Sequence, residues 1–331
     1  MNDQAASTTA SRAQAAFASL RQFLDSRIIG QGDLNLKLLT ALLADGHLLV
    51  EGAPGLAKTT AIKTLSEAIE GDYHRVQFTP DLLPADVTGT DIYRPQAGTF
   101  DFQRGPIFHN LVLADEINRA PAKVQSALLE AMAERQVTVG ATTYDLPELF
   151  LVMATQNPIE QEGTYPLPEA QLDRFLMYVR VDYPDLEAEQ AILRLVREQT
   201  RSGKADAGSV TVITQHDIFE ARREVLELHV ADQLERYIVE LIHATRSPQR
   251  YDQTIAGWVR YGASPRATIG LERASRAHAW LSGRDYVSPE DIHSVAYEVL
   301  RHRIILDFEA QADGVTTDRL IEELLARVPV P

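Results

Sequence analysis

A glycine-rich loop between an apolar strand and a helix-forming segment constrains the fold of this chain most. The apolar run Leu48-Leu49-Val50-Glu51 leads directly into Gly52-Ala53-Pro54-Gly55-Leu56-Ala57-Lys58-Thr59-Thr60. This is the order of a P-loop, in which backbone N–H groups at a helix N-terminus hold phosphates. The loop therefore predicts that Lys58 meets the β- and γ-phosphates of a nucleotide and that the Thr59 hydroxyl binds Mg²⁺. An incidental glycine turn is the alternative for the loop taken alone.

One position departs from the pattern G-x-x-x-x-G-K-[ST]. Ala57 stands where the second glycine is expected. Alanine still offers its N–H to a phosphate, but we expect it to do so only with a negative φ, since side chains disfavour the left-handed region. Gly55 loosens the loop before it and compensates in part.

An acidic pair at the end of a second apolar run strengthens the prediction. Asp115 and Glu116 follow Leu111-Val112-Leu113-Ala114. A carboxylate in this place holds Mg²⁺, often through water, and the next one can orient and deprotonate the attacking water. We assign Asp115 to the metal and Glu116 to the water. An ordinary exposed strand end is the alternative, but the P-loop at this spacing favours an Mg²⁺-dependent ATPase.

The hydrophobic pattern predicts the class of fold. Short apolar runs alternate with helix-period segments from residue 48 to about residue 181, which is typical of a parallel sheet covered by helices. Segments 92–102 and 137–144 each surround a glycine and read as hairpins inserted into this α/β core. Beyond residue 209 only helix-period segments occur, and Ser264-Pro265 and Ser288-Pro289 each open a helix.

A polar, glycine-bearing stretch between Glu198 and Ser209 marks the domain boundary. The predicted organisation is a tail and helix over 1–26, an α/β core over 27–200, a linker over 201–210 and a helical domain over 211–331.

Composition excludes several classes of function. The 47 acidic against 32 basic residues give a net charge of −15, which disfavours nucleic acid as a partner. The chain has no cysteine, so disulfides, thiolate metal sites and cysteine nucleophiles are excluded. No apolar stretch approaches the roughly 18 residues of a membrane span, and the start does not read as a signal peptide. We expect a cytoplasmic protein.

The residues around the acidic pair resemble a known family. Asp115-Glu116-Ile117-Asn118-Arg119-Ala120-Pro121 is similar to the corresponding strand and loop of the AAA+ MoxR family. The resemblance covers the whole chain and includes stretches 29–31, 78–86, 154–158 and 169–175; Ala57 is usual in this family. It implies an AAA+ P-loop core with a parallel sheet between helices, followed by a small C-terminal α-helical lid domain.

The resemblance also implies roles for residues outside the two motifs. Asn157 resembles the sensor-1 residue that bonds the γ-phosphate or the attacking water, and Arg266 resembles the sensor-2 arginine of the lid. Arg174 resembles the arginine finger that completes a neighbouring subunit's site. The alternatives are a turn-forming asparagine before Pro158 and two solvated arginines, Arg174 pairing with Asp173 at the surface.

Two further segments match the family. Ile29 and Gly30, with Ile28, resemble the segment that flanks adenine. Segment 79–89 and the hairpin over 91–102 resemble an insert whose loops face the pore or the top of a ring; a surface flap without contacts is the alternative.

The resemblance implies a homo-oligomeric ring, a hexamer, that binds ATP and Mg²⁺. Hydrolysis would drive chaperone-like remodelling or maturation of partner protein complexes, alongside a partner with a von Willebrand A domain. Two alternatives stay open. One is a nucleotide-gated assembly switch with slow turnover. The other is a nucleic-acid motor, against which the net charge and the aromatic content of 7% argue.

Overall fold

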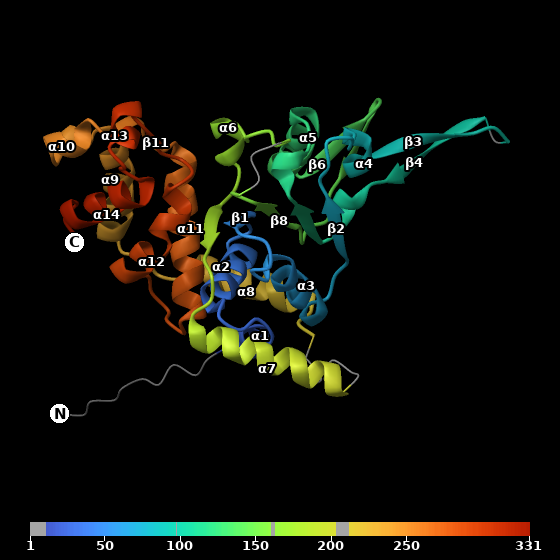
Figure 1. Ribbon diagram of the computed structural model, residues 1–331, viewed down its shortest axis with the longest axis horizontal. Coiled ribbons are helices and arrows are strands. Elements are labelled where there is room, and N and C mark those ends of the chain that lie inside the picture. The colour runs from blue at the N-terminus through green and yellow to red at the C-terminus, as the bar shows by residue number, and fades with distance from the viewer. Residues whose placement is uncertain (1–10, 97, 160–162, 203–211) are drawn as a thin grey trace.

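The computed structural model describes residues 11–96, 98–159, 163–202 and 212–331. A five-stranded parallel sheet forms the centre of the core, in the order β2-β5-β8-β1-β9 (Figure 1). These strands are β1 (Leu48–Gly52), β2 (Tyr73–Gln77), β5 (Leu111–Asp115), β8 (Leu151–Gln156) and β9 (Met177–Val181). The predicted α/β class is confirmed, although the sequence did not reveal β2.

Helices cover both faces of this sheet, because successive side chains of a strand point to opposite faces. Leu111 and Leu113 pack in the cluster that also contains residues of the N-terminal helices, whereas Val112 and Ala114 pack with α5 (Ala122–Glu134). The N-terminal helices are α1 (Arg12–Arg27), α2 (Gly32–Leu43) and α3 (Lys58–Ala68). Both faces are apolar, which explains why the central strands appear as continuous apolar runs.

Both predicted hairpins are confirmed. One joins β3 (Gly89–Arg94) and β4 (Thr99–Arg104), and the other joins β6 (Gln136–Val139) and β7 (Thr142–Asp145). The β3–β4 hairpin points away from the body of the molecule (Figure 1). Helix α4 (Pro84–Thr88) connects β2 to this hairpin, and a 3₁₀ turn at Pro106–Phe108 connects the hairpin to β5. A second such turn, Ile117–Arg119, follows β5, and α6 (Glu169–Leu172) precedes β9.

The C-terminal part is helical, as predicted, with one exception. Its longer helices are α8 (Gln215–Glu227), α9 (Asp232–Arg246), α11 (Pro265–Leu281), α12 (Pro289–Leu300) and α14 (Thr317–Arg327). Short helices α10 (Gln253–Ala256) and α13 (Phe308–Ala312) and a 3₁₀ turn at Pro248–Arg250 lie between them. Helix α7 (Leu186–Ser202) precedes this part and follows β9. Ser264 and Ser288 cap α11 and α12 as expected. The expectation of helices only is wrong, because β10 (Val259–Tyr261) pairs with β11 (Ile305–Leu306) in antiparallel fashion.

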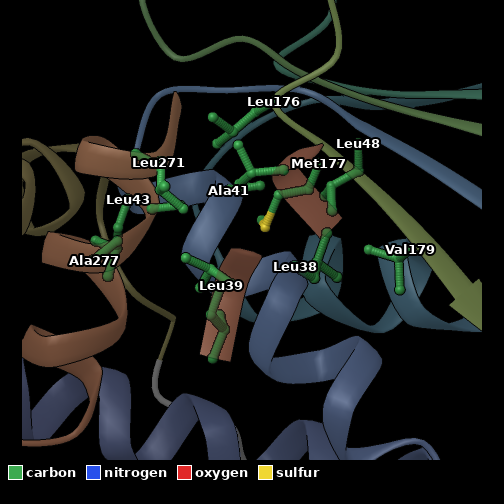
Figure 2. Close-up of a cluster of buried hydrophobic side chains, with 14 of the residues drawn as sticks. Leu38, Leu39, Ala41, Leu43, Leu48, Leu176, Met177, Val179, Leu271 and Ala277 are labelled. Carbon is green, nitrogen blue, oxygen red and sulfur yellow. The ribbon is translucent and has the colours of Figure 1, made fainter. Parts of the chain in front are cut away.

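A shared hydrophobic cluster joins the core to this helical part. Figure 2 shows Leu38 and Leu39 of α2 beside Met177 and Val179 of β9, with Leu271 of α11 across from them. All of these side chains are buried. The α11 helix therefore packs directly on the core.

The predicted linker at 201–210 lies largely outside the described residues, which stop at Ser202 and resume at Val212. After this gap Ile213 pairs with Ile69 at the end of α3, and α8 then contacts α1, α2 and α11. The proposed boundary at this point stays a prediction. Within the described ranges, no helix is both long and apolar enough to cross a membrane.

Candidate active site

The P-loop and the acidic pair meet at the carboxyl edge of the sheet. The loop after β1 lines a pocket of about 350 Å³ together with the ends of β5 and β8. The residues lining it are Pro54, Gly55, Leu56, Ala57, Lys58, Thr59, Thr60, Asp115, Glu116, Thr155, Gln156 and Asn157. Gly52 and Ala53 lead into this loop from β1. One pocket thus contains both predicted motifs and Asn157.

The backbone at Ala57 differs from the expectation. Its φ is 58°, in the left-handed region, so the predicted negative φ is wrong. Ala57 is the N-cap of α3, and its carbonyl accepts the hydrogen bond of the Ala61 N–H at 2.9 Å. The chain must turn sharply from the loop into the helix at this point. A left-handed residue other than glycine costs roughly 1–2 kcal/mol.

Lys58 begins α3 and points back over the loop. Its Nζ donates to the carbonyl of Gly52 and, at 3.3 Å each, to those of Ala53 and Gln156. Burial lowers the pKa of Lys58, while the charges of Asp115, Glu116 and Glu51 oppose this shift. The ammonium group is therefore held at the mouth of the pocket, beside the free N–H groups of a helix N-terminus.

Asp115 is buried, and both of its carboxylate oxygens accept hydrogen bonds. Its Oδ1 accepts from the Thr155 hydroxyl at 2.6 Å, and its Oδ2 accepts from Nε and a terminal nitrogen of Arg75 at 3.0 and 2.6 Å. Arg75 lies on β2, the neighbour of β5, and was not identified from the sequence. A carboxylate oxygen has two lone pairs, so Oδ1 keeps one for a further ligand.

Glu116 lies just beyond the strand, with φ 56°. Its N–H donates to the Thr155 hydroxyl at 2.9 Å, and its Oε2 accepts from Gln77 at 2.7 Å and from Arg119 at 2.9 Å. Gln77 lies directly opposite Asp115 in the β2–β5 register. Thus β2 supplies partners to both acidic residues, which only the pairing of the strands could reveal.

Asn157 lies one residue beyond β8 and is 7% exposed. Its Oδ1 accepts from the Ile159 N–H at 3.1 Å across Pro158. The side chain therefore forms the turn that was the alternative to the sensor role. This bond uses the oxygen only, and the amide nitrogen remains a donor at the rim of the phosphate pocket.

Arg174 and Arg266 are not in this pocket. Both line a second pocket of about 320 Å³ between the α2–β1 turn, the end of α5 and α11. Arg174 donates to the Leu129 carbonyl at 3.0 Å, and Arg266 lies 3.8 Å from the Asp173 carboxylate. The surface pair of Asp173 with Arg174 does not form; the partners of Asp173 are other residues.

The second pocket is strongly basic. Five arginines line it against two aspartates, Asp45 and Asp173. The arginines are Arg135, Arg174, Arg266, Arg273 and Arg303. This excess contrasts with the chain's net charge of −15. We refer to it as the arginine pocket, and its charge suits an anionic group.

Ile29 and Gly30 lie next to the segment that follows β9. Gln31 donates to the Asp182 carbonyl at 3.1 Å, and a Cβ on Gly30 would come within 2.9 Å of the Ala188 Cβ. Gly30 also has φ 78°. Because Val181 pairs with Gly52, this segment lies near the start of the P-loop.

Comparisons with known proteins agree with this geometry. The family described as "ATPase family associated with various cellular activities (AAA)" matches residues 47–177, and the AAA lid domain matches residues 254–324. The chain is 45% identical to chaperone MoxR1 of Mycobacterium tuberculosis over 92% of this chain and 79% of that protein. The chain belongs to the MoxR family of AAA ATPases. It is also 33% identical to protein MoxR of Paracoccus denitrificans, over 96% of this chain and 97% of that protein.

A solved structure extends the match to the whole MoxR fold. A putative ATPase from Cytophaga hutchinsonii superposes with a TM-score of 0.88 and 47% identity, covering 96% of each chain. The α/β AAA core and the C-terminal lid are therefore those of the family. Membership of this family identifies the protein as an ATPase.

Proposed function

We propose that this protein hydrolyses Mg²⁺-ATP at sites completed between neighbouring subunits of a ring, and that the cycle remodels or matures partner protein complexes. The observation that carries the proposal is the separation of the phosphate pocket from the arginine pocket within one chain. The name of the relative chaperone MoxR1 supports the chaperone role. A hexamer and a partner with a von Willebrand A domain are further parts of the proposal.

The residues of the phosphate pocket fit a nucleoside triphosphate and a divalent cation. Lys58 and the N–H groups at the start of α3 would hold the phosphates, while Thr59 and Asp115 would hold Mg²⁺. Asp115 has the lone pair that this requires, on Oδ1. When bound, the ion neutralises charge on the phosphates. Ile29 and Gly30 would flank the adenine from beside the P-loop.

Glu116 is the proposed base for the attacking water. Its carboxylate lines the pocket and forms an ion pair with Arg119 at 2.9 Å. Asn157 would contact the γ-phosphate or the water with its amide nitrogen. Both residues follow adjacent strands, so the sheet fixes their spacing.

Arg174 and Arg266 would serve the neighbouring subunit. A chain that carries its phosphate-binding residues in one pocket and these arginines in another can use both in a head-to-tail ring. Each interface would then combine the Lys58 of one subunit with the Arg174 of the next. An arginine that stabilises the negative charge on the transferring phosphoryl group typically raises the rate by about 10³ to 10⁵.

A slow nucleotide-gated switch is a second candidate. The contacts of Arg75 with Asp115 and of Gln77 with Glu116 favour it, because each occupies one oxygen of a carboxylate that the reaction uses. Comparing the rate of hydrolysis with and without the partner protein separates a motor from a switch.

The test uses Glu116→Gln, which should bind ATP with the affinity of the parent and hydrolyse it at least about 100-fold more slowly. Glutamine is nearly isosteric but takes no proton, so the protein should remain in its ATP-bound form. Immobilised Glu116→Gln should then retain its protein partners from the source cell in Mg²⁺-ATP and release them when EDTA is added.

Lys58→Ala is the control, because it should lose tight ATP binding while the surface stays the same. Equal capture by Glu116→Gln and Lys58→Ala would remove the ATP-driven part of the proposal. Turnover of Glu116→Gln at the parent rate would show that Glu116 is not the base.

A further inference from the structure

One carboxylate connects the segment of Arg174 to the lid. Asp173 immediately precedes Arg174, and its Oδ1 accepts from Nε of Arg303 at 2.7 Å. Its Oδ2 accepts from the Ser264 hydroxyl at 2.9 Å and lies 3.8 Å from Arg266. Three residues of the lid thus lie around the Asp173 carboxylate, and one of them is Arg266.

Arg303 is the most confined member of this group. Its side chain is 3% exposed, and its guanidinium makes five hydrogen bonds. Besides the carboxylate, it donates to the carbonyls of Asp173, Phe175 and Leu176 at 3.2, 2.6 and 3.0 Å. Arg303 of the lid therefore fixes the backbone on both sides of Arg174, at Asp173 and Phe175. A guanidinium suits this because its donors are held in a rigid, planar arrangement.

Packing behind these bonds leaves little room for movement. Leu176 lies between two glycines: a Cβ on Gly46 would come within 2.5 Å of its side chain, and one on Gly270 within 3.3 Å. Figure 2 shows Leu176 where α2, β9 and Leu271 of α11 converge. The helix that carries Arg266 thus approaches the segment of Arg174 closely.

Ser264 extends this connection to Arg266. Its hydroxyl donates to Asp173 and accepts from the Arg266 N–H at 3.2 Å. A single hydroxyl therefore joins the N-terminus of α11 to the Asp173 carboxylate. Arg174 itself donates from its side chain to the Leu129 carbonyl at 3.0 Å and from its N–H to the Gln171 carbonyl at 3.1 Å.

We propose that Asp173 and Arg303 are positioning residues that hold Arg174 and Arg266 as one unit for the ATP site of the neighbouring subunit. The inference rests on the proposed function, in which these two arginines act across the subunit interface. Neither Asp173 nor Arg303 needs to touch the nucleotide. A misplacement of about 1 Å of a catalytic group can cost roughly 100-fold in rate.

The proposal predicts that a change at Asp173 impairs the arginine side of a subunit interface and leaves the P-loop side intact. Each subunit gives its P-loop to one interface and its arginines to the other. Asp173→Asn should lower the ATPase rate of the ring by about 10- to 100-fold. Its nucleotide affinity, measured by calorimetry on dilute subunits, should stay within about twofold of the parent, because the P-loop is untouched.

Mixed rings provide the decisive measurement. Asp173→Asn subunits mixed with Lys58→Ala subunits should recover activity, at up to about a quarter of interfaces for random equal mixing, because intact P-loops then meet intact arginines. Asp173→Asn subunits mixed with Arg174→Ala subunits should recover none. A defect of the fold alone would not distinguish the two mixtures.

Recovery with Arg174→Ala, or none with Lys58→Ala in rings shown to co-assemble, would overturn the inference. A reference mixture of Arg174→Ala with Lys58→Ala tests the shared site itself, and its failure would refute the proposed function instead. Asp318→Asn is the matched control: it removes the carboxylate charge that pairs with Arg180 of β9 at 3.2 Å and with Arg301 at 3.0 Å, away from Asp173, and should keep the parent rate.

If Asp173→Asn does not assemble, Arg303→Lys is assayed in the same mixtures. Lysine keeps the buried charge next to Asp173 but cannot donate to the carboxylate and three carbonyls together. It should show the same pattern, and recovery of Arg303→Lys by Arg174→Ala subunits would equally overturn the inference.

Discussion

At the residue scale, the Thr155 hydroxyl organises the two acidic residues. It accepts from the Glu116 N–H at 2.9 Å and donates to Asp115 Oδ1 at 2.6 Å. The side chain is 1% exposed, so water cannot replace these bonds easily. An unmade hydrogen bond to a buried charged group costs about 1.5–3 kcal/mol.

We therefore expect Thr155→Val to reduce kcat by about 10- to 100-fold, since valine keeps the shape and removes both hydrogen bonds. Thr155→Ser should retain the rate within a few fold. Steady-state ATPase assays at saturating Mg²⁺-ATP measure the difference. Equal rates for Thr155→Val and Thr155→Ser would show that the hydroxyl has no part in catalysis.

The sequence predicted only those site residues that lie in contiguous motifs. Lys58, Asp115 and Glu116 were found because each lies within a strand-and-loop pattern. Arg75 and Thr155 were not, since they reach Asp115 from neighbouring strands whose register the sequence does not state. The φ of Ala57 was mispredicted because loop closure outweighs the preference of a small side chain.

At the scale of elements, two buried histidines hold the start of β9. The His47 carbonyl accepts from the Leu176 N–H at 2.8 Å, and His302 Nε2 bonds the Phe175 carbonyl at 3.1 Å. His47 Nδ1 also accepts from the Val152 N–H at 3.1 Å, which leaves its Nε2 to donate to Met132. The His47 ring is therefore neutral, because one of its nitrogens accepts a hydrogen bond.

This arrangement makes stability sensitive to acid. Burial, followed by the charge of Arg135, lowers the pKa of His47 to about 4, although Asp45 opposes the shift. Burial likewise lowers the pKa of His302 well below its usual value. The unfolded chain takes up these protons below about pH 6.5 and the folded chain does not, so stability falls as pH falls from about 6.5 to 4.

His47 should contribute about 2 kcal/mol to the loss of unfolding free energy between pH 7 and pH 5. His47→Asn, which still accepts and donates but does not titrate, should lose that part of the pH dependence. Urea unfolding at both pH values measures it. An unchanged pH dependence in His47→Asn would place the titration elsewhere.

Elements were predicted where local signals were strong. The caps at Ser264 and Ser288 specify the starts of their helices through hydrogen bonds within a few residues. The edge strand β2 was missed, because only Val76 of its five residues is buried and no alternation results. The two residues of β11 form a strand only because Val259 and Tyr261 lie beside them.

At the scale of the whole molecule, the fold places the predicted site residues of one chain in two separate pockets. The P-loop and the acidic pair lie at the carboxyl edge of the sheet, and Arg174 and Arg266 lie in the arginine pocket against the lid. The sequence identified these residues, but the separation of the pockets depends on how the lid packs on α2 and β9. That separation is the observation on which the proposed shared site rests.

Mixing Arg174→Ala with Lys58→Ala subunits tests the shared site most directly. Each variant alone should be nearly inactive, because loss of an arginine finger costs about 10³ to 10⁵ in rate and loss of Lys58 removes ATP binding. After dissociation and reassembly, the account predicts an ATPase rate that peaks near equal proportions. The rate should stay at background when the Lys58→Ala/Arg174→Ala double variant replaces either partner. Background activity at every ratio, in mixtures shown to co-assemble, would contradict the account and place Arg174 within its own subunit's fold.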